Sequence, residues 1–193
     1  MGRSPGGKEM KAYIGIDPGQ KGCITEINCF TDNKQIIFHD IPLLPERGID
    51  SSKTFYLLYN MKEEEHLDIF CLIEKAQPLP KQGCTSTFNY GLGYGKILSI
   101  LEILEIPFEE IRPVKWKKEF SLTIPKNQKG KKAKSKDKKE LSAKVAIQLY
   151  PKLKKEFYTE RGKLLDGRVD SLLIATYAER KNAGNKITRS KRK

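Results

Sequence analysis

The sequence predicts an α/β protein with a mixed five-stranded sheet flanked by helices, and three observations lead to this class. Three short apolar segments joined by turns, at 12–17, 22–30 and 35–41, are typical of strands that pair as hairpins and therefore run antiparallel. The segment 68–74 is apolar on both faces, which indicates a central buried strand. Helical and strand patterns then alternate, with a fifth strand expected at 107–112, and this alternation favours a mixed sheet.

The helices expected around these strands follow from caps and apolar periodicity. Asp50-Ser51-Ser52 can cap the first of them, and a Gly-rich stretch opens the second. We expect helices at about 50–65, 87–104, 114–120, 137–150 and 167–182.

Length and charge limit the class of protein. The 193 residues suit one domain, expected at 11–182, with a Gly-rich disordered or non-native segment at 1–10 and a frayed basic tail at 183–193. The chain holds 37 Lys+Arg against 24 Asp+Glu, a net charge of +13, which predicts a polyanionic partner. No apolar run approaches the roughly 18 residues that span a bilayer, so nucleic acid is favoured over membrane.

Cysteine and histidine usage indicates which metals the chain could bind. The four cysteines form no C-x-x-C pair and three lie in expected strands, which favours a reducing, intracellular compartment without separating cytoplasm, nucleoid and organelle. The two histidines lie away from other soft ligands, so a zinc site is not expected, and any metal would be a hard ion on carboxylates. These residues are Cys23, Cys29, Cys71, Cys84, His39 and His66.

Two acids close apolar strands. Asp17 ends the first strand and precedes a Pro-Gly turn, so a simple turn aspartate would also explain it. Glu74 ends the strand that is apolar on both faces, where unpaired carboxylates are rare. Pairing with Lys75 or another basic residue is the alternative explanation for Glu74.

Two further acids open the last helix. With an advance of about 100° per residue, Asp170 lies about 40° from Asp166, inside the arc that also holds Leu173 and Tyr177. A solvated face would place the acids opposite that arc. A purely structural role as the helix N-cap would be enough to explain Asp166. No such role explains Asp170. Carboxylates gathered at one end of a sheet repel one another unless a cation joins them, and Mg²⁺ prefers such oxygen ligands.

Six segments in order resemble the RuvC-type Holliday-junction resolvases, in particular the branch of the plant chloroplast resolvase and related phage enzymes. The resemblance spans about residues 12–180, and its first motif alone is shared with sugar kinases and related ATPases. The segments are IGIDPGQKG, IEKAQPLPKQG, FNYGLGYG, VKWKKEF, KSKDKKELSAKVAIQLYP and DGRVDSLLIATYA.

The resemblance implies an RNase H-like fold, a homodimer with two active sites, and paired symmetric nicks across a four-way DNA junction. It implies catalytic and metal-binding roles for Asp17, Glu74 and Asp170, with two Mg²⁺ ions per site roughly 3.5–4 Å apart and Mn²⁺ able to substitute. Asp17 would bridge the ions, Glu74 would bind one, and Asp166 and Asp170 the other. Some relatives place the fourth acid three residues before the last aspartate, where this chain has Gly167, so Asp166 is the candidate here.

Lysines dominate the segment 126–144, which contains nine of them. A solvated loop is the simple explanation, but the corresponding region of the family flanks the phosphate that is cut. Lys138 is the candidate for a catalytic lysine near the attacking water. The further candidates for DNA contact in this segment are Lys131, Lys132 and Lys134.

Other candidate DNA contacts lie after the second acid and around the single tryptophan. Phe88 and Tyr90 could stack on opened bases beside Lys81 and Gln82, or could anchor the helix in the core. Trp116 is expected in the core, with its lysine neighbours turned outward toward phosphate. The helical stretch 97–104 is apolar nearly all round, as a dimer interface would require. The three lysines are Lys115, Lys117 and Lys118.

Three other functions remain open from the sequence. A kinase-like or ATPase-like phosphotransferase would share the first motif, but it normally needs a second similar domain. A non-catalytic junction-binding protein would not require its acids to converge. A less selective nuclease of the same fold would cut flaps or RNA–DNA hybrids as well as junctions.

Overall fold

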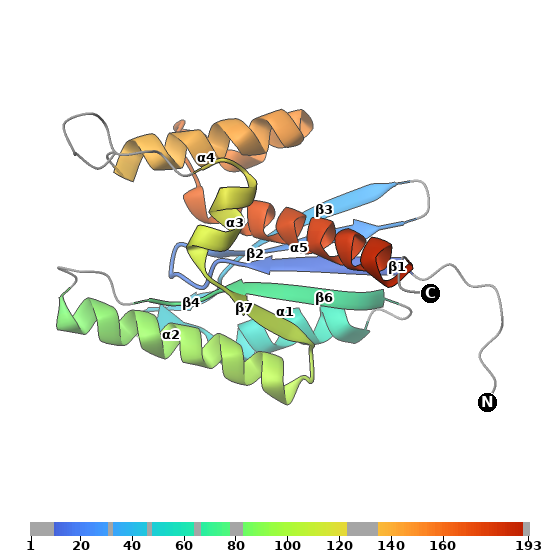
Figure 1. Cartoon of the computed structure of the whole chain (residues 1–193). Coiled ribbons are helices and arrows are strands. Elements are labelled where there is room, and N and C mark those ends of the chain that lie inside the picture. The colour runs from blue at the N-terminus through green and yellow to red at the C-terminus, as the bar shows by residue number, and fades with distance from the viewer. Residues whose placement is uncertain are drawn as a thin grey trace.

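A computed structural model describes residues 10–30, 33–45, 48–63, 67–77, 83–122 and 135–190. Within this part of the chain a five-stranded sheet forms the centre, with helices on both faces (Figure 1). The strand order is β3-β2-β1-β6-β7. The strands are β1 (Met10–Ile16), β2 (Cys23–Cys29), β3 (Lys34–Asp40), β6 (Leu67–Glu74) and β7 (Phe108–Ile111).

The strand directions match the predicted mixed sheet. β1, β2 and β3 pair antiparallel in sequence order, whereas β6 pairs parallel with β1 on one side and with β7 on the other. This order and these directions are those of an RNase H-like sheet, so the predicted fold class is confirmed. Because β1, β6 and β7 run in the same direction, their carboxyl ends meet at one edge of the sheet.

The helices form two layers. On one face lie α1 (Ser51–Glu63) and α2 (Cys84–Ile103), and on the other lie α3 (Pro113–Glu119) and α5 (Asp166–Ser190), as Figure 1 shows. Helix α4 (Ser135–Leu149) packs outside α5 and continues into a 3₁₀ segment, η1 (Pro151–Phe157). A short hairpin, β4 (Leu43–Leu44) with β5 (Gly48–Ile49), precedes α1.

Each face of the sheet buries its own apolar cluster, because successive strand residues point to opposite sides. Tyr13 and Leu72 pack toward α5, in the cluster that includes the fully buried Trp116. Ile14 and Ile73 pack in the other cluster, with residues of α1 and α2. The central strands are therefore covered on both sides, as the apolar run of β6 predicted.

Several element boundaries differ from the predicted ones. Helix α2 begins at Cys84 rather than near 87. Helix α5 runs on to Ser190, so the predicted end at 182 is wrong for the backbone, because Lys and Arg are good helix formers and no proline follows. Residues 1–9 and 191–193 lie outside the described residues. No helix in the described part of the chain is long and apolar enough to cross a membrane.

Candidate carboxylate site at the edge of the sheet

Asp17 and Glu74 come together because they end neighbouring parallel strands. Ile16 of β1 is in register with Ile73 of β6, so the residues that follow each of them leave the sheet side by side. Asp17 is held in its turn by its amide, which donates to the carbonyl of Cys23 at 3.0 Å. Its side chain accepts a longer contact from the amide of Gly19, at 3.4 Å.

Helix α5 brings Asp166 and Asp170 to the same edge through close backbone contacts. A Cβ added at Gly15 of β1 would lie 2.2 Å from the carbonyl oxygen of Ser171, so the helix axis sits directly against the strand. A Cβ added at Gly167 would lie 2.1 Å from the carbonyl oxygen of Lys21, in the turn after Asp17. Only glycine fits at either position, and these two contacts set how near the helix acids come to the strand acids.

The electrostatics of the four acids show that they share one environment. Burial raises the pKa of Asp17 to about 7, and the charges of Asp170, Glu74 and Asp166 add to the shift. Burial likewise raises the pKa of Asp170 to about 6, with further increases from Glu74 and Asp166. Lys117 and a hydrogen bond from Ser142 oppose that rise. Four carboxylates from three elements therefore repel one another at a single place.

Two of the acids, Glu74 and Asp170, each have a defined partner on α3. The indole N–H of Trp116 donates to Glu74 Oε2 at 2.7 Å. Lys117 Nζ lies 3.9 Å from Asp170 Oδ2, and the same ammonium lies 4.7 Å from the centre of the Trp116 ring. These contacts place α3 over the carboxylates, as a support for their side chains.

The fourth acid, Asp166, pairs with a lysine from another helix. Lys139 Nζ of α4 lies 2.5 Å from Asp166 Oδ2. Arg168, on the opposite side of the same helical turn, donates two hydrogen bonds to Asp40 at 2.8 and 2.7 Å. It also reaches the side chain of Glu156 at 3.3 Å. The start of α5 is thus fixed to the end of β3, to η1 and to α4.

The types of side chain in this site are those that bind a hard divalent cation. The site consists of carboxylates, without histidine or cysteine, and half-buried carboxylates that repel one another are stabilised when a cation joins them. Among the described residues, no three acidic, histidine or cysteine side chains lie close enough together to ligate one ion as they are placed here. Asp166 is turned to Lys139, Asp170 toward Lys117 and Glu74 to Trp116.

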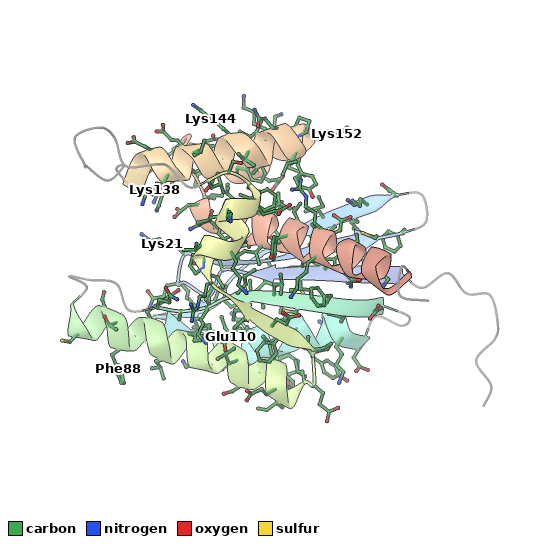
Figure 2. The ribbon with its side chains drawn as sticks, in the orientation of Figure 1. Lys21, Phe88, Glu110, Lys138, Lys144 and Lys152 are labelled. Carbon is green, nitrogen blue, oxygen red and sulfur yellow. The ribbon has the colours of Figure 1, made fainter. Side chains whose placement is uncertain are left out.

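The lysines around the site were only partly foreseen. Lys138, the candidate for a catalytic lysine, is exposed on α4, and its role stays a prediction (Figure 2). Its neighbour Lys139 is the residue that reaches an acid. The Lys117 ammonium lies near both Asp170 and the Trp116 ring, and its contact with phosphate stays a prediction. No local signal in the sequence pointed to Lys139, because it reaches Asp166 from another helix.

The aromatic candidates differ from each other. Phe88 is 70% exposed on the outer side of α2, so the alternative that it anchors the core is wrong for the single chain (Figure 2). Tyr90 is half-buried, and burial together with the charges of Asp17 and Glu74 raises its pKa to about 12. Trp116 is fully buried, which confirms the expected core position.

The remaining candidate residues fall into two groups. Lys115 and Lys118 are exposed on α3, as expected for outward-facing lysines. The stretch 97–104 turns Ile97, Ile100 and Leu101 into the core and leaves Ile103 70% exposed, so its role as a dimer interface stays a prediction. The candidates outside the described residues are Lys81, Gln82, Lys131, Lys132 and Lys134.

Comparison with known proteins finds likeness in structure alone. No family model matches the chain, and no curated protein matches its sequence. RuvC of T. thermophilus in complex with a Holliday junction substrate is similar at 14% identity and a TM-score of 0.46, over 86% of this chain and 90% of that one. A second Thermus thermophilus RuvC structure is similar at 14% identity and a TM-score of 0.47, over 90% and 96%.

A third similar structure comes from a eukaryote. The crystal structure of the yeast mitochondrial Holliday junction resolvase Ydc2 is similar at 15% identity and a TM-score of 0.46, over 84% of this chain and 75% of that one. Because these identities are low, the function of this chain is argued from its own residues.

Proposed function

We propose that this chain is a magnesium-dependent endonuclease that cuts four-way DNA junctions. The observation that carries the proposal is the convergence of Asp17, Glu74, Asp166 and Asp170 at the carboxyl ends of β1 and β6. A group of like charges that raises the pKa of two of its members, Asp17 and Asp170, is costly to the fold unless it serves a cation. Its position at the ends of parallel strands is where α/β sheets commonly carry their sites.

The chemistry of the group fits phosphodiester hydrolysis. The four carboxylates would hold Mg²⁺, which supplies charge stabilisation at the phosphate and a more acidic water when bound. The chain's own residues hold the carboxylates in place: Trp116 orients Glu74 and Lys117 faces Asp170. Lys139, paired with Asp166, is a cation that a phosphate could take over from the carboxylate.

The basic surface next to the acids supports a nucleic-acid substrate. Lys21 lies in the turn after Asp17, and Lys138 and Lys144 extend from α4, which begins beside the same edge (Figure 2). The chain as a whole has a net charge of +13. Such a charge favours association with phosphate through release of condensed counterions. The four-way junction as the particular substrate rests on the motif resemblance, with the exposed Phe88 available to stack on an opened base.

The test is cleavage of a labelled synthetic four-way junction with Mg²⁺ or with EDTA. Wild-type protein should give paired nicks that need Mg²⁺, and Asp17→Asn and Asp170→Asn should abolish them while junction binding in EDTA is retained. Asp68→Asn is the matched control, because Asp68 lies exposed at the opposite end of the strand that carries Glu74. That variant should cut like wild type.

The same experiment separates the alternatives. Tight binding without any cut would leave a junction-binding protein. Equal cutting of a flap, an RNA–DNA hybrid and a junction would keep the nuclease and reject the junction as its preferred substrate. Stabilisation by ATP without cleavage would indicate the phosphotransferase class instead.

A further inference from the structure

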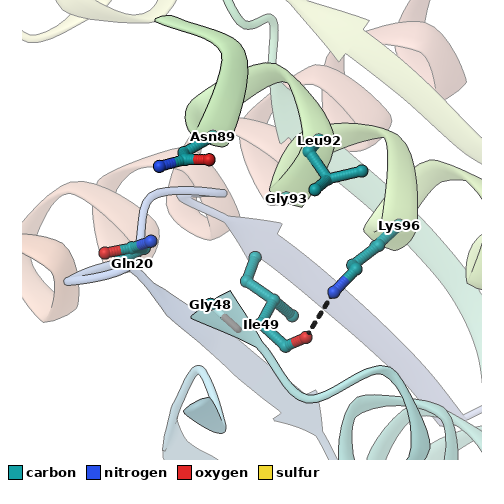
Figure 3. Close-up of a pocket in the computed structure, with 7 residues that line it drawn as sticks. All are labelled: Gln20, Gly48, Ile49, Asn89, Leu92, Gly93 and Lys96. Atoms are coloured by element: carbon teal, nitrogen blue, oxygen red, sulfur yellow. Dashed lines mark hydrogen bonds between the residues drawn. The ribbon is translucent and has the colours of Figure 1, made fainter. Parts of the chain in front are cut away.

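A pocket of about 310 Å³ lies beside the carboxylate site and is not used by the hydrolysis proposed above. It is formed by three segments that are distant in sequence: the turn after β1, the short strand β5 and the first half of α2 (Figure 3). Its volume is within the range of small-molecule sites. The lining residues are Gln20, Gly48, Ile49, Asn89, Leu92, Gly93 and Lys96.

The pocket is close to the acids along two of its walls. Gln20 belongs to the same turn as Asp17, whose side chain contacts the amide of Gly19. Asn89 precedes Tyr90 on α2. The phenol of Tyr90 is near enough to Asp17 and Glu74 for their charges to contribute to its raised pKa. A group held in the pocket would therefore be next to a phosphate held at the carboxylates.

The walls of the pocket suit a flat ligand with polar edges. Lys96, the cation among the lining residues, donates to the carbonyl of Ile49 at 2.9 Å, which engages its ammonium within the wall. No acidic side chain is among these lining residues. Ile49 and Leu92 supply apolar surface, and the carboxamides of Gln20 and Asn89 stand at the opening (Figure 3).

A glycine keeps this space open. Gly93 packs α2 against β5, because a Cβ at this position would lie 3.0 Å from Cδ1 of Ile49. A side chain there would displace Ile49 or fill the pocket. On the opposite wall, Gly48 has a φ of +71°, and Nε2 of Gln20 lies 3.4 Å from where its Cβ would be. The turn residue Gln20 is thus packed against β5 by one side of its amide.

A flat neutral ligand with an edge of donors and acceptors is a nucleobase. Carboxamides can offer a donor and an acceptor together, which is how Asn and Gln read base edges. Enzymes acting on opened DNA commonly take an unstacked base into a pocket with apolar faces and polar edge contacts.

We propose that this pocket receives an unpaired nucleobase next to the cut phosphodiester, and that Gln20 and Asn89 set the base preference of cleavage. This inference rests on the proposed nuclease function and adds to it a specificity-determining site. The acids would then decide whether DNA is cut, and the two amides would decide at which sequence.

The test uses a set of four-way junctions that differ only in the bases flanking the exchange point. Gln20→Met and Asn89→Leu keep the side-chain size and remove the hydrogen bonds. We expect wild-type protein to prefer one base at one position, and each variant to reduce that preference on the order of tenfold while still cutting the least favoured junctions at near wild-type rate. Gln148→Ala and Asn60→Ala, exposed on α4 and α1, are the matched controls and should keep the preference.

A binding measurement in EDTA makes the inference testable apart from cleavage. Removing the preferred base to leave an abasic site should weaken binding by wild-type protein, and should have much less effect on the double variant of Gln20 and Asn89. Unchanged base preference in both amide variants, or equal effects of the abasic site on both proteins, would overturn the inference. Absence of any cleavage by wild type, with the abasic effect present, would overturn the nuclease function and leave the base pocket.

Discussion

The indole of Trp116 helps to orient Glu74. The N–H of Trp116 donates to Oε2 at 2.7 Å, and the ring itself is fully buried in the core beneath α5. A hydrogen bond to an ionised group contributes about 1.5–3 kcal/mol, more than one between neutral groups. The sole tryptophan therefore links the core packing to the position of one candidate metal ligand.

Trp116→Phe should keep an aromatic ring in the core and remove the donor. We expect the rate of junction cleavage to fall by about tenfold to a hundredfold, since about 1.4 kcal/mol corresponds to tenfold, while binding in EDTA is unchanged. Phe120→Leu, at a neighbouring buried aromatic of the same cluster, controls for lost packing. If both variants lose the same activity at equal stability, the hydrogen bond has no special role.

Asp17 should destabilise the fold when no cation is present. Its pKa is raised from 3.8 to about 7, so the folded protein holds this proton more tightly than the unfolded chain does. Stability should therefore fall as pH rises from about 4 to about 7, and stay at the lower level above that range. Mg²⁺ at pH 8 should restore it, because an ion bound only by the folded state stabilises that state.

Asp17→Asn should accordingly raise the melting temperature in EDTA at pH 8 and have a smaller effect at pH 5. Each kcal/mol of relieved repulsion corresponds to roughly 2–4 °C for a protein of this size. Thermal unfolding followed by circular dichroism measures the difference, and the control Asp68→Asn, which keeps Asp17, should show the same pH dependence as wild type. A variant less stable than wild type at pH 8 in EDTA would contradict the prediction that ionised Asp17 destabilises the fold.

At the scale of elements, the contact between α5 and β1 positions half of the acids. Gly15→Ala would place a methyl group 2.2 Å from the carbonyl oxygen of Ser171 and 2.3 Å from the amide nitrogen of Ala175. Both neighbours are backbone atoms that cannot rotate away. We expect a loss of at least about 1–3 kcal/mol in the free energy of unfolding, together with a higher Mg²⁺ concentration for half-maximal cleavage.

Gly95→Ala is the matched control on α2, where a Cβ would meet nothing within 4 Å. This substitution should raise the free energy of unfolding, by up to about 1 kcal/mol, because alanine favours a helix over glycine. Denaturant titration of the two variants measures both changes in the free energy of unfolding. Equal effects of the two substitutions would mean that α5 does not press on β1 as described.

The sequence predicted elements wherever the signal was local. The apolar run of β6, the turn before β3 and the Asp50 cap, whose carboxylate accepts the amide of Lys53 at 3.1 Å, all depend on adjacent residues. The hairpin of β4 with β5 and the 3₁₀ segment η1 were missed. The former has two residues per strand and the latter is a seven-residue 3₁₀ segment that begins at a proline, so neither carries a recognisable period.

The residues of the candidate site also divide into those with a local signal in the sequence and those without one. Asp17 and Glu74 could be found as acids that end buried strands, and Asp170 as an acid on the buried arc of a helix. Their partners could not, because Trp116 and Lys139 reach the acids across different elements. Sequence spacing specifies which face a side chain takes, but not which helix lies opposite it.

At the scale of the whole molecule, positive charge is placed close to an acidic centre. The carboxylates would repel DNA on their own, so the surrounding lysines must supply the attraction. Lys138 and Lys144 lie on α4, on the same side of the sheet as the start of α5 (Figure 2). Lys53 and Lys62 are equally exposed but lie on α1, on the opposite face (Figure 1).

These two pairs of lysines allow local contact to be separated from net charge. Junction binding in EDTA should weaken with salt, and each phosphate contact contributes about −0.9 to the slope of log K against log salt. Changing Lys138 and Lys144 together to Gln should make that slope shallower by roughly one to two contacts. Changing Lys53 and Lys62 to Gln removes the same formal charge and should leave the slope nearly unchanged. Equal slopes in the two double variants would mean that DNA responds to the total charge rather than to the face that carries the acids.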